Sequence, residues 1–129
     1  MIPPVPDVLR ACAFLAKRYG WELSPQNVRL LDSIKLRHQQ AAALAASPED
    51  EPAALFFAFS LDLGVLGEDV ITLPMVLSRN QTGALKLVLR ASRYELVEQA
   101  RAVSAGFVTF PELRAWFAAR LVPVVPSGG

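Results

Sequence analysis

The 129-residue sequence contains one cysteine, Cys12, and one histidine, His38. A single cysteine cannot form a disulfide within the chain, and we expect a cytoplasmic location from this. A metal site built from histidines and cysteines needs several such ligands, so we predict no metal site of that kind and no cofactor. Catalysis by a Ser-His or Cys-His pair is also not expected, because both residues fall on the apolar faces of predicted helices.

Long apolar runs are missing as well. A membrane span takes roughly 18 or more apolar residues, whereas residues 53–61 are followed by Asp62 and residues 70–78 contain Pro74. The sequence has no Gly-x-Gly-x-x-Gly run and no Walker-type loop, which excludes nucleotide sites of those kinds. No basic stretch precedes an apolar one near the N-terminus, so we expect neither a secretory signal nor a membrane partner.

The composition is that of a globular domain, with 53% apolar and 19% charged residues. Ten arginines against three lysines favour a GC-rich bacterium or its phage as the source. Charge is unevenly spread: residues 38–78 hold six acids and no lysine or arginine, while residues 1–37 and 79–129 each have an excess of basic residues. Solvated helix surfaces with acids at helix N-termini explain this pattern. Head-to-tail self-association or a basic partner-binding face is the alternative.

Signals that start and stop helices dominate the sequence. The starts are Ser24-Pro25, Ser47-Pro48, Ser92-x-x-Glu95 and Thr109-x-x-Glu112, and the stops are Gly20, Gly64 and Gly106. No stretch shows the sustained alternation of a half-buried strand. We therefore predict an all-α fold, a compact bundle of five to seven helices in one domain. An extended Pro-rich lead is expected at 1–6, the helical domain at 7–121 and a flexible tail at 122–129.

The boundaries of the predicted helices are clear except between residues 72 and 105. Asp7 can cap a first helix that ends near Tyr19, and a second helix runs from Pro25 to about Ala46. A third helix follows Ser47 and carries the core candidates Phe56, Phe57 and Phe59. After a short helix that starts near Thr72 and ends at 78–81, we expect a helix over 81–91 and a new start at Ser92. A single helix over 81–105 is the competing prediction.

One polar cluster could bind an anion. Residues 79–83 read Arg-Asn-Gln-Thr-Gly, and Lys86, Arg90 and Arg93 follow, with the last three on one face if the segment is helical. A helix N-terminus beside an arginine is a natural anion site. The candidate anion- or nucleic-acid-binding residues are therefore Arg79, Asn80, Lys86, Arg90 and Arg93. The alternative is an ordinary solvated helix flank. Glu95 and Glu98 close by would partly neutralise a DNA-binding strip.

Residues 73–121 resemble the C-terminal half of the Fic/Doc family. That family has a His-Pro-Phe-x-x-Gly-Asn-Lys-Arg loop entering a helix, and Pro74 and Asn80 match it in type, one residue further apart. Its chains often end in a short helix after an Ala-x-Gly-like turn, which residues 104–117 resemble. The catalytic histidine position holds Leu73 and the phosphate-binding arginine position holds Thr82. The resemblance implies a helical relative that has lost nucleotide transfer.

These observations predict a small helical protein-protein interaction or adaptor protein without catalytic activity. Its partner would be another protein or a second copy of the chain, because the high apolar content favours an exposed apolar patch. One alternative is a divergent Fic/Doc-like toxin-type nucleotide transferase that uses Arg79 and Asn80. The other is a nucleic-acid-binding helical module that uses Lys86, Arg90 and Arg93.

Overall fold

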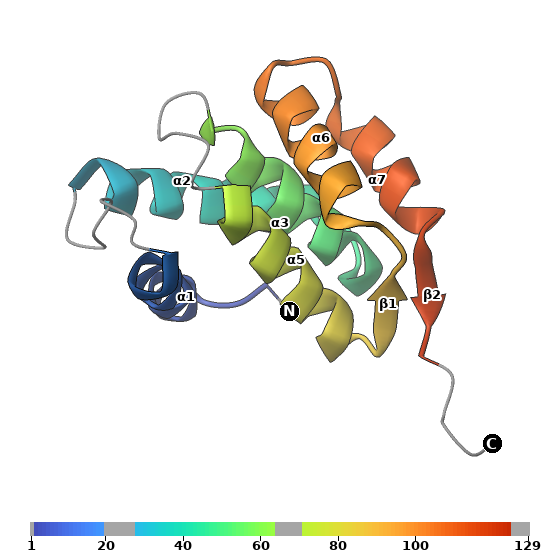
Figure 1. Ribbon diagram of the computed structural model, residues 1–129, viewed down its shortest axis with the longest axis horizontal. Helices are drawn as coiled ribbons and strands as arrows, with labels where there is room; N and C mark the ends of the chain where they lie inside the picture. The colour runs from blue at the N-terminus through green and yellow to red at the C-terminus, as the bar shows by residue number, and fades with distance from the viewer. Residues whose placement is uncertain (1, 20–27, 64–70, 125–129) are drawn as a thin grey trace.

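The computed structural model describes residues 2–19, 28–63 and 71–124. These residues form six α-helices, one turn of 3-10 helix and a two-stranded antiparallel sheet (Figure 1). In chain order the elements are α1 (Val5–Tyr19), α2 (Val28–Leu44), η1 (Pro48–Asp50), α3 (Glu51–Ser60), α5 (Thr72–Ala84), β1 (Leu87–Leu89), α6 (Arg93–Ser104), α7 (Phe110–Ala118) and β2 (Leu121–Pro123). The predicted helical bundle in one domain is confirmed, with a small sheet added to it.

Helix α3 is the centre of the molecule. Nine of its ten residues are buried, and α2, α5, α6 and α7 surround it (Figure 1). A helix that is apolar on all sides needs such a position. Phe56 and Phe59 are buried as predicted, and Phe56 packs against Phe117 of α7 with ring centroids 5.4 Å apart. Phe57 is only half-buried and contacts Phe110 at the start of α7.

The predicted starts of the last two helices are confirmed by the hydrogen bonds of their capping boxes. Ser92 Oγ accepts from the Glu95 amide while Glu95 accepts from the Ser92 amide, and Thr109 and Glu112 repeat the arrangement. Gly106 ends α6 with φ +82°, a conformation that glycine adopts without strain.

The first helix begins earlier than predicted. The amides of Asp7 and Val8 both donate to the Pro4 carbonyl, so α1 starts at Val5. Asp7 lies inside the first turn, where it pairs with Arg10 at 2.9 Å, and is not the cap. The predicted start of α2 at Pro25 and the stops at Gly20 and Gly64 lie outside the described residues.

The prediction of a helix over residues 81–91 is wrong. Helix α5 continues through 78–81. The hydroxyls of Ser78 and Thr82 donate to the carbonyls of Met75 and Arg79 in the preceding turn, so they do not compete for the backbone amides. The chain then leaves the helix, Lys86 takes a positive φ of 57°, and β1 follows. A single helix over 81–105 is therefore excluded, and the new start at Ser92 is correct.

Strand β1 exists because it pairs with a segment more than thirty residues away. Leu87 faces Pro123, Val88 faces Val122 and Leu89 faces Leu121. The two strands therefore form a ribbon beside α5 and the end of α7 (Figure 1). Residues 122 and 123, which the sequence placed in a tail, belong to this ribbon.

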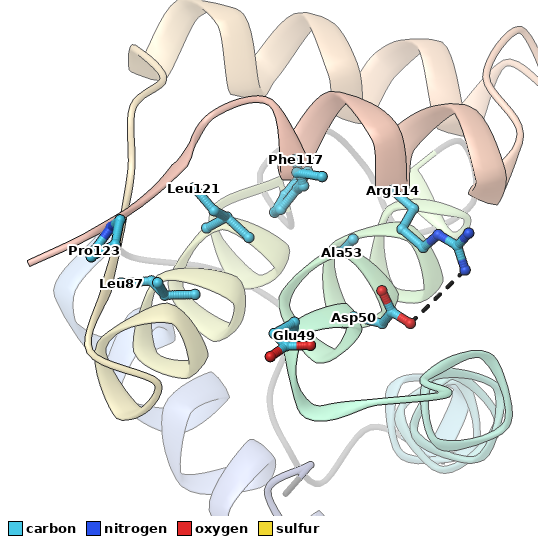
Figure 2. A pocket seen from close by; sticks show the side chains of 9 residues that line it. Glu49, Asp50, Ala53, Leu87, Arg114, Phe117, Leu121 and Pro123 are labelled. Carbon is cyan, nitrogen blue, oxygen red and sulfur yellow. Dashed lines mark ion pairs between the residues drawn. The ribbon is translucent and has the colours of Figure 1, made fainter.

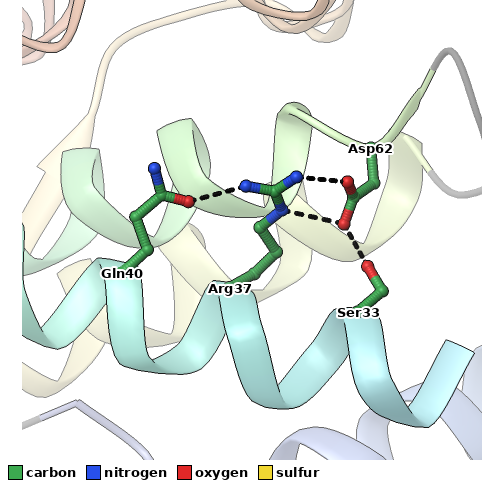
Figure 3. A network of polar contacts seen from close by, with 4 residues as sticks. All are labelled: Ser33, Arg37, Gln40 and Asp62. Carbon is green, nitrogen blue, oxygen red and sulfur yellow. Dashed lines mark hydrogen bonds and ion pairs between the residues drawn. The ribbon is translucent and has the colours of Figure 1, made fainter.

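A polar network joins α2 to the chain just after α3 (Figure 3). Arg37 donates to both carboxylate oxygens of Asp62, from Nε at 2.9 Å and from Nη2 at 2.5 Å, and also to Gln40 at 2.8 Å. The Ser33 hydroxyl donates to the same carboxylate. Partial burial alone would raise the pKa of Asp62, but the hydrogen bonds from Arg37 and Ser33 outweigh it and lower that pKa. Asp62 therefore fixes α2 against α3 in its ionised form.

Candidate functional site

An apolar pocket of about 340 Å³ opens between the start of α3, the second half of α7 and the ribbon (Figure 2). Each of these three parts supplies three lining residues. They are Glu49, Asp50 and Ala53 from η1 and α3, Arg114, Phe117 and Ala118 from α7, and Leu87, Leu121 and Pro123 from the ribbon.

The periodicities of the strands and of α7 build the walls of the pocket. Alternate side chains of a strand point to the same side, so Leu121 and Pro123 face the pocket together with Leu87 of the other strand. Residues 114, 117 and 118 lie on one side of α7 because they are three and four positions apart. Phe117 is buried and the small side chain of Ala118 leaves the space open.

Charged groups lie only at the mouth of this pocket (Figure 2). Arg114 Nη1 and Asp50 Oδ2 are 3.9 Å apart, at the outer limit of an ion pair. Glu49 is exposed and has no ion-pair partner among the described residues. Both carboxylates lie at the start of α3, the positive end of its dipole. The three groups together give the mouth one net negative charge.

The sequence predicted that Arg79 and Asn80 lie at a helix N-terminus. The structure does not place them there. Both are exposed in the second half of α5, towards the negative end of its dipole, which disfavours anions. Lys86, Arg90 and Arg93 do not share a helix face either. Lys86 lies in the turn before β1, Arg90 follows β1, and Arg93 is the first residue of α6. The error follows from the missed strand.

The ribbon nevertheless brings two of these cations to one side. The Val124 amide donates to the Lys86 carbonyl and the Arg90 amide donates to the Arg120 carbonyl, which continues the strand register in both directions. The side opposite the pocket, called here the outer ribbon face, carries Val88 and Val122, with Arg90 and Arg120 at one end and Lys86 and Val124 at the other. Arg120 was not predicted, because only the register brings it beside Arg90.

Arg120 is held in place by its neighbours. Its guanidinium lies 4.0 Å from the centroid of the Trp116 ring and its Nε lies 3.7 Å from Glu95 Oε2. Stacking of this kind orients an arginine without removing its charge. A shallow hollow of about 280 Å³ lies beside the ribbon, lined by Arg79, Gly83 and Val88 among others.

The surroundings of Cys12 and His38 indicate a structural role for both residues. Burial raises the pKa of the Cys12 thiol to about 11, so it stays protonated at neutral pH and is a poor nucleophile. His38 is half-buried and its Nε2 lies 2.8 Å from the Pro3 carbonyl, which ties α2 to the chain before α1. Within residues 2–19, 28–63 and 71–124, no three His, Cys, Asp or Glu side chains are grouped so that they could hold a metal ion.

The segment that resembles the Fic/Doc loop is part of α5. Leu73 is buried in the core, and the Thr82 side chain is buried and bonded to the Arg79 carbonyl. The two positions that would carry catalysis and phosphate binding in that family therefore point into the protein here.

Comparison with known proteins gives no relative for this chain. No family model matches the sequence, and neither the curated proteins nor the solved structures contain a significant match. In the part of the chain that the structure describes, no helix is long and apolar enough to cross a membrane. We infer a function from the apolar pocket and from the outer ribbon face.

Proposed function

We propose that this protein is a small helical interaction module of bacterial or phage origin, located in the cytoplasm, which holds a segment of a partner polypeptide. The partner is another protein or a second copy of the chain. The observation that carries this proposal is the pocket of about 340 Å³ between α3, α7 and the ribbon. Interfaces draw most of their affinity from a few large side chains that fill pockets of this kind.

The distribution of polar groups supports binding rather than catalysis. The walls are apolar, and the three charged groups lie at the mouth, where they can orient a segment without being buried. Cys12, the most nucleophilic side chain by type, is buried and protonated. An apolar pocket with a charged rim has the anatomy of an interface centre.

The pocket can be blocked from an exposed position. Ala118→Trp places a large ring over the opening, whereas Ala115→Trp adds the same ring to an exposed position of α7 that does not line the pocket. Peptides selected from a displayed random library on the wild-type protein should bind Ala118→Trp at least about tenfold more weakly. They should bind Ala115→Trp with wild-type affinity, measured by fluorescence anisotropy. If both variants bind the selected peptides equally, the pocket is not the binding site.

A second function, nucleic-acid binding, is favoured by the outer ribbon face. Its register collects Lys86, Arg90 and Arg120, and residues 71–94 contain no acid. A cluster of cations attracts phosphates and releases counterions on binding. Lys86→Glu with Arg90→Glu should abolish any mobility shift of an oligonucleotide at low salt, while Lys35→Glu on α2 changes the same kind of charge away from the ribbon. No shift with the wild-type protein would end this candidate.

A further inference from the structure

The pocket selects for an occupant that is apolar over most of its length. Leu87, Phe117 and Leu121 form its walls, and none of their side chains offers a hydrogen bond. A charged group in this space would lose its hydration without gaining a partner. A large aromatic or aliphatic side chain instead gains free energy in proportion to the apolar surface it buries.

The mouth adds a charge requirement. Glu49 is exposed and unpaired among the described residues, and Arg114 approaches Asp50 at one contact of 3.9 Å. The net charge of the mouth is negative, and the apolar walls beside it strengthen the field there. The group next to the anchor is therefore a cation.

The chain itself exposes such a combination at the start of α6. Tyr94 is 73% exposed, and Arg93 beside it is exposed and has no ion-pair partner among the described residues. A tyrosine ring fills apolar space while its hydroxyl can donate to a carboxylate at the rim. Phe107 is more exposed, at 81%, but no lysine or arginine lies within five residues of it in the sequence.

Tyr94 lies beside the ribbon that forms one wall of the pocket. Glu95, next to Tyr94, has its carboxylate 3.7 Å from Arg120, and Arg120 precedes Leu121 in the pocket wall. A two-fold symmetric contact uses one patch of surface twice, so the inserted group and the group that receives it must lie in the same patch. In the dimer proposed below, the ribbon forms part of that patch.

We propose that two copies of this chain form a two-fold symmetric dimer in which Tyr94 of each copy occupies the pocket of the other. Arg93 of the inserting copy then faces Glu49 at the mouth. This inference rests on the proposed function, because it names the segment that the pocket holds. It also accounts for the division of the chain into an acidic middle and a basic C-terminal part.

Light scattering coupled to size exclusion tests the dimer over a range of protein concentrations. The wild-type protein should have twice the mass of the 14.0 kDa chain. Tyr94→Ala and Ala118→Trp should each weaken the dimer about thirtyfold, as loss of a central aromatic contact does. Phe107→Ala and Ala115→Trp are the matched controls and should leave the dimer intact. A dimer that survives Tyr94→Ala and Ala118→Trp would use another surface and would overturn the proposal.

Two mixing experiments make the assignment specific. Tyr94→Ala keeps the pocket and Ala118→Trp keeps the tyrosine, so an equimolar mixture should form a heterodimer with one intact contact, which neither variant forms alone. Glu49→Arg and Arg93→Glu should each weaken the dimer about fivefold, and the variant carrying both changes should recover wild-type affinity. If the mixture forms no heterodimer and the variant carrying both charge changes stays weak, Tyr94 and Arg93 do not pair with the pocket and its mouth.

The same measurements separate this inference from the proposed function. A wild-type monomer at every concentration, with library peptides that still lose affinity in Ala118→Trp, would overturn the dimer and leave the pocket as a binding site for another protein. A monomer with no pocket-dependent peptide would overturn both.

Discussion

Two aspartate–arginine pairs in this molecule differ in their geometry and in the exposure of the arginine. Arg37 holds Asp62 through two hydrogen bonds of 2.5 and 2.9 Å, and the two side chains are only 19% and 14% exposed (Figure 3). Arg114 meets Asp50 at one contact of 3.9 Å, and the two side chains are 53% and 19% exposed (Figure 2). The first pair fixes two elements of the fold, whereas the second leaves charge available at the mouth of a pocket.

The positions of the residues explain this difference. Ser33, Arg37 and Gln40 lie on one side of α2 at spacings of four and three, so all three side chains converge and the guanidinium is held on two sides. Arg114 has no such support at the pocket mouth. Bidentate geometry with little exposure makes an ion pair costly to break, and a single exposed contact contributes little to stability.

The largest expected effect comes from breaking the pair between α2 and α3. Arg37→Met leaves the Asp62 carboxylate partly buried with the Ser33 hydroxyl as its remaining donor. The free energy of unfolding should fall by about 2–3 kcal/mol, because a desolvated charge loses its partner. Urea denaturation measures this loss. If Arg114→Met costs as much as Arg37→Met, the contrast between the two pairs does not hold.

A smaller effect is expected from pH at the first pair. The pKa of Asp62 is lower in the folded protein than its ordinary value of 3.8. The folded state therefore binds fewer protons at this group than the unfolded state, and the stability it contributes is complete above about pH 5 and is lost as the pH falls below 3.8.

Asp62→Asn isolates this contribution. The difference in unfolding free energy between the wild-type protein and Asp62→Asn should be constant at neutral pH and should shrink as the pH falls from about 5 to 2. Urea denaturation at several pH values gives both curves. A difference that is the same at pH 2 and pH 7 would show that the ionised carboxylate is not what stabilises the contact.

The local features of this fold could be read from the sequence, and the non-local ones could not. The capping boxes at Ser92 and Thr109 and the apolar face with Phe56 are determined by residues a few positions apart. The run Leu87–Leu89 reads equally well as helix or strand, and only its pairing with residues 121–123 makes it a strand. Long-range pairing has no signal in a window of local sequence.

The pocket was missed for the same reason. Its lining comes from three segments, and in the sequence Glu49 and Asp50 are only acids that follow the helix start Ser47-Pro48. No pattern in the sequence connects Arg114 with Asp50, since the contact depends on how α7 packs against α3. The candidate cations were recognised individually, but their arrangement depends on the ribbon.

The smallest expected effect concerns the second pair and sharpens the contrast. Arg114→Met should change the free energy of unfolding by no more than about 0.5 kcal/mol, because the contact is long and its arginine is exposed. It also removes the one positive charge at the pocket mouth, so Arg93 of a second copy should be bound about threefold more tightly.

Glu49→Gln changes the charge of the mouth in the opposite direction and should weaken the dimer by a similar factor. Dissociation constants from light scattering at low salt measure both changes, and high salt should reduce both. If the two variants shift the dissociation constant in the same direction, side-chain packing rather than charge controls entry to the pocket.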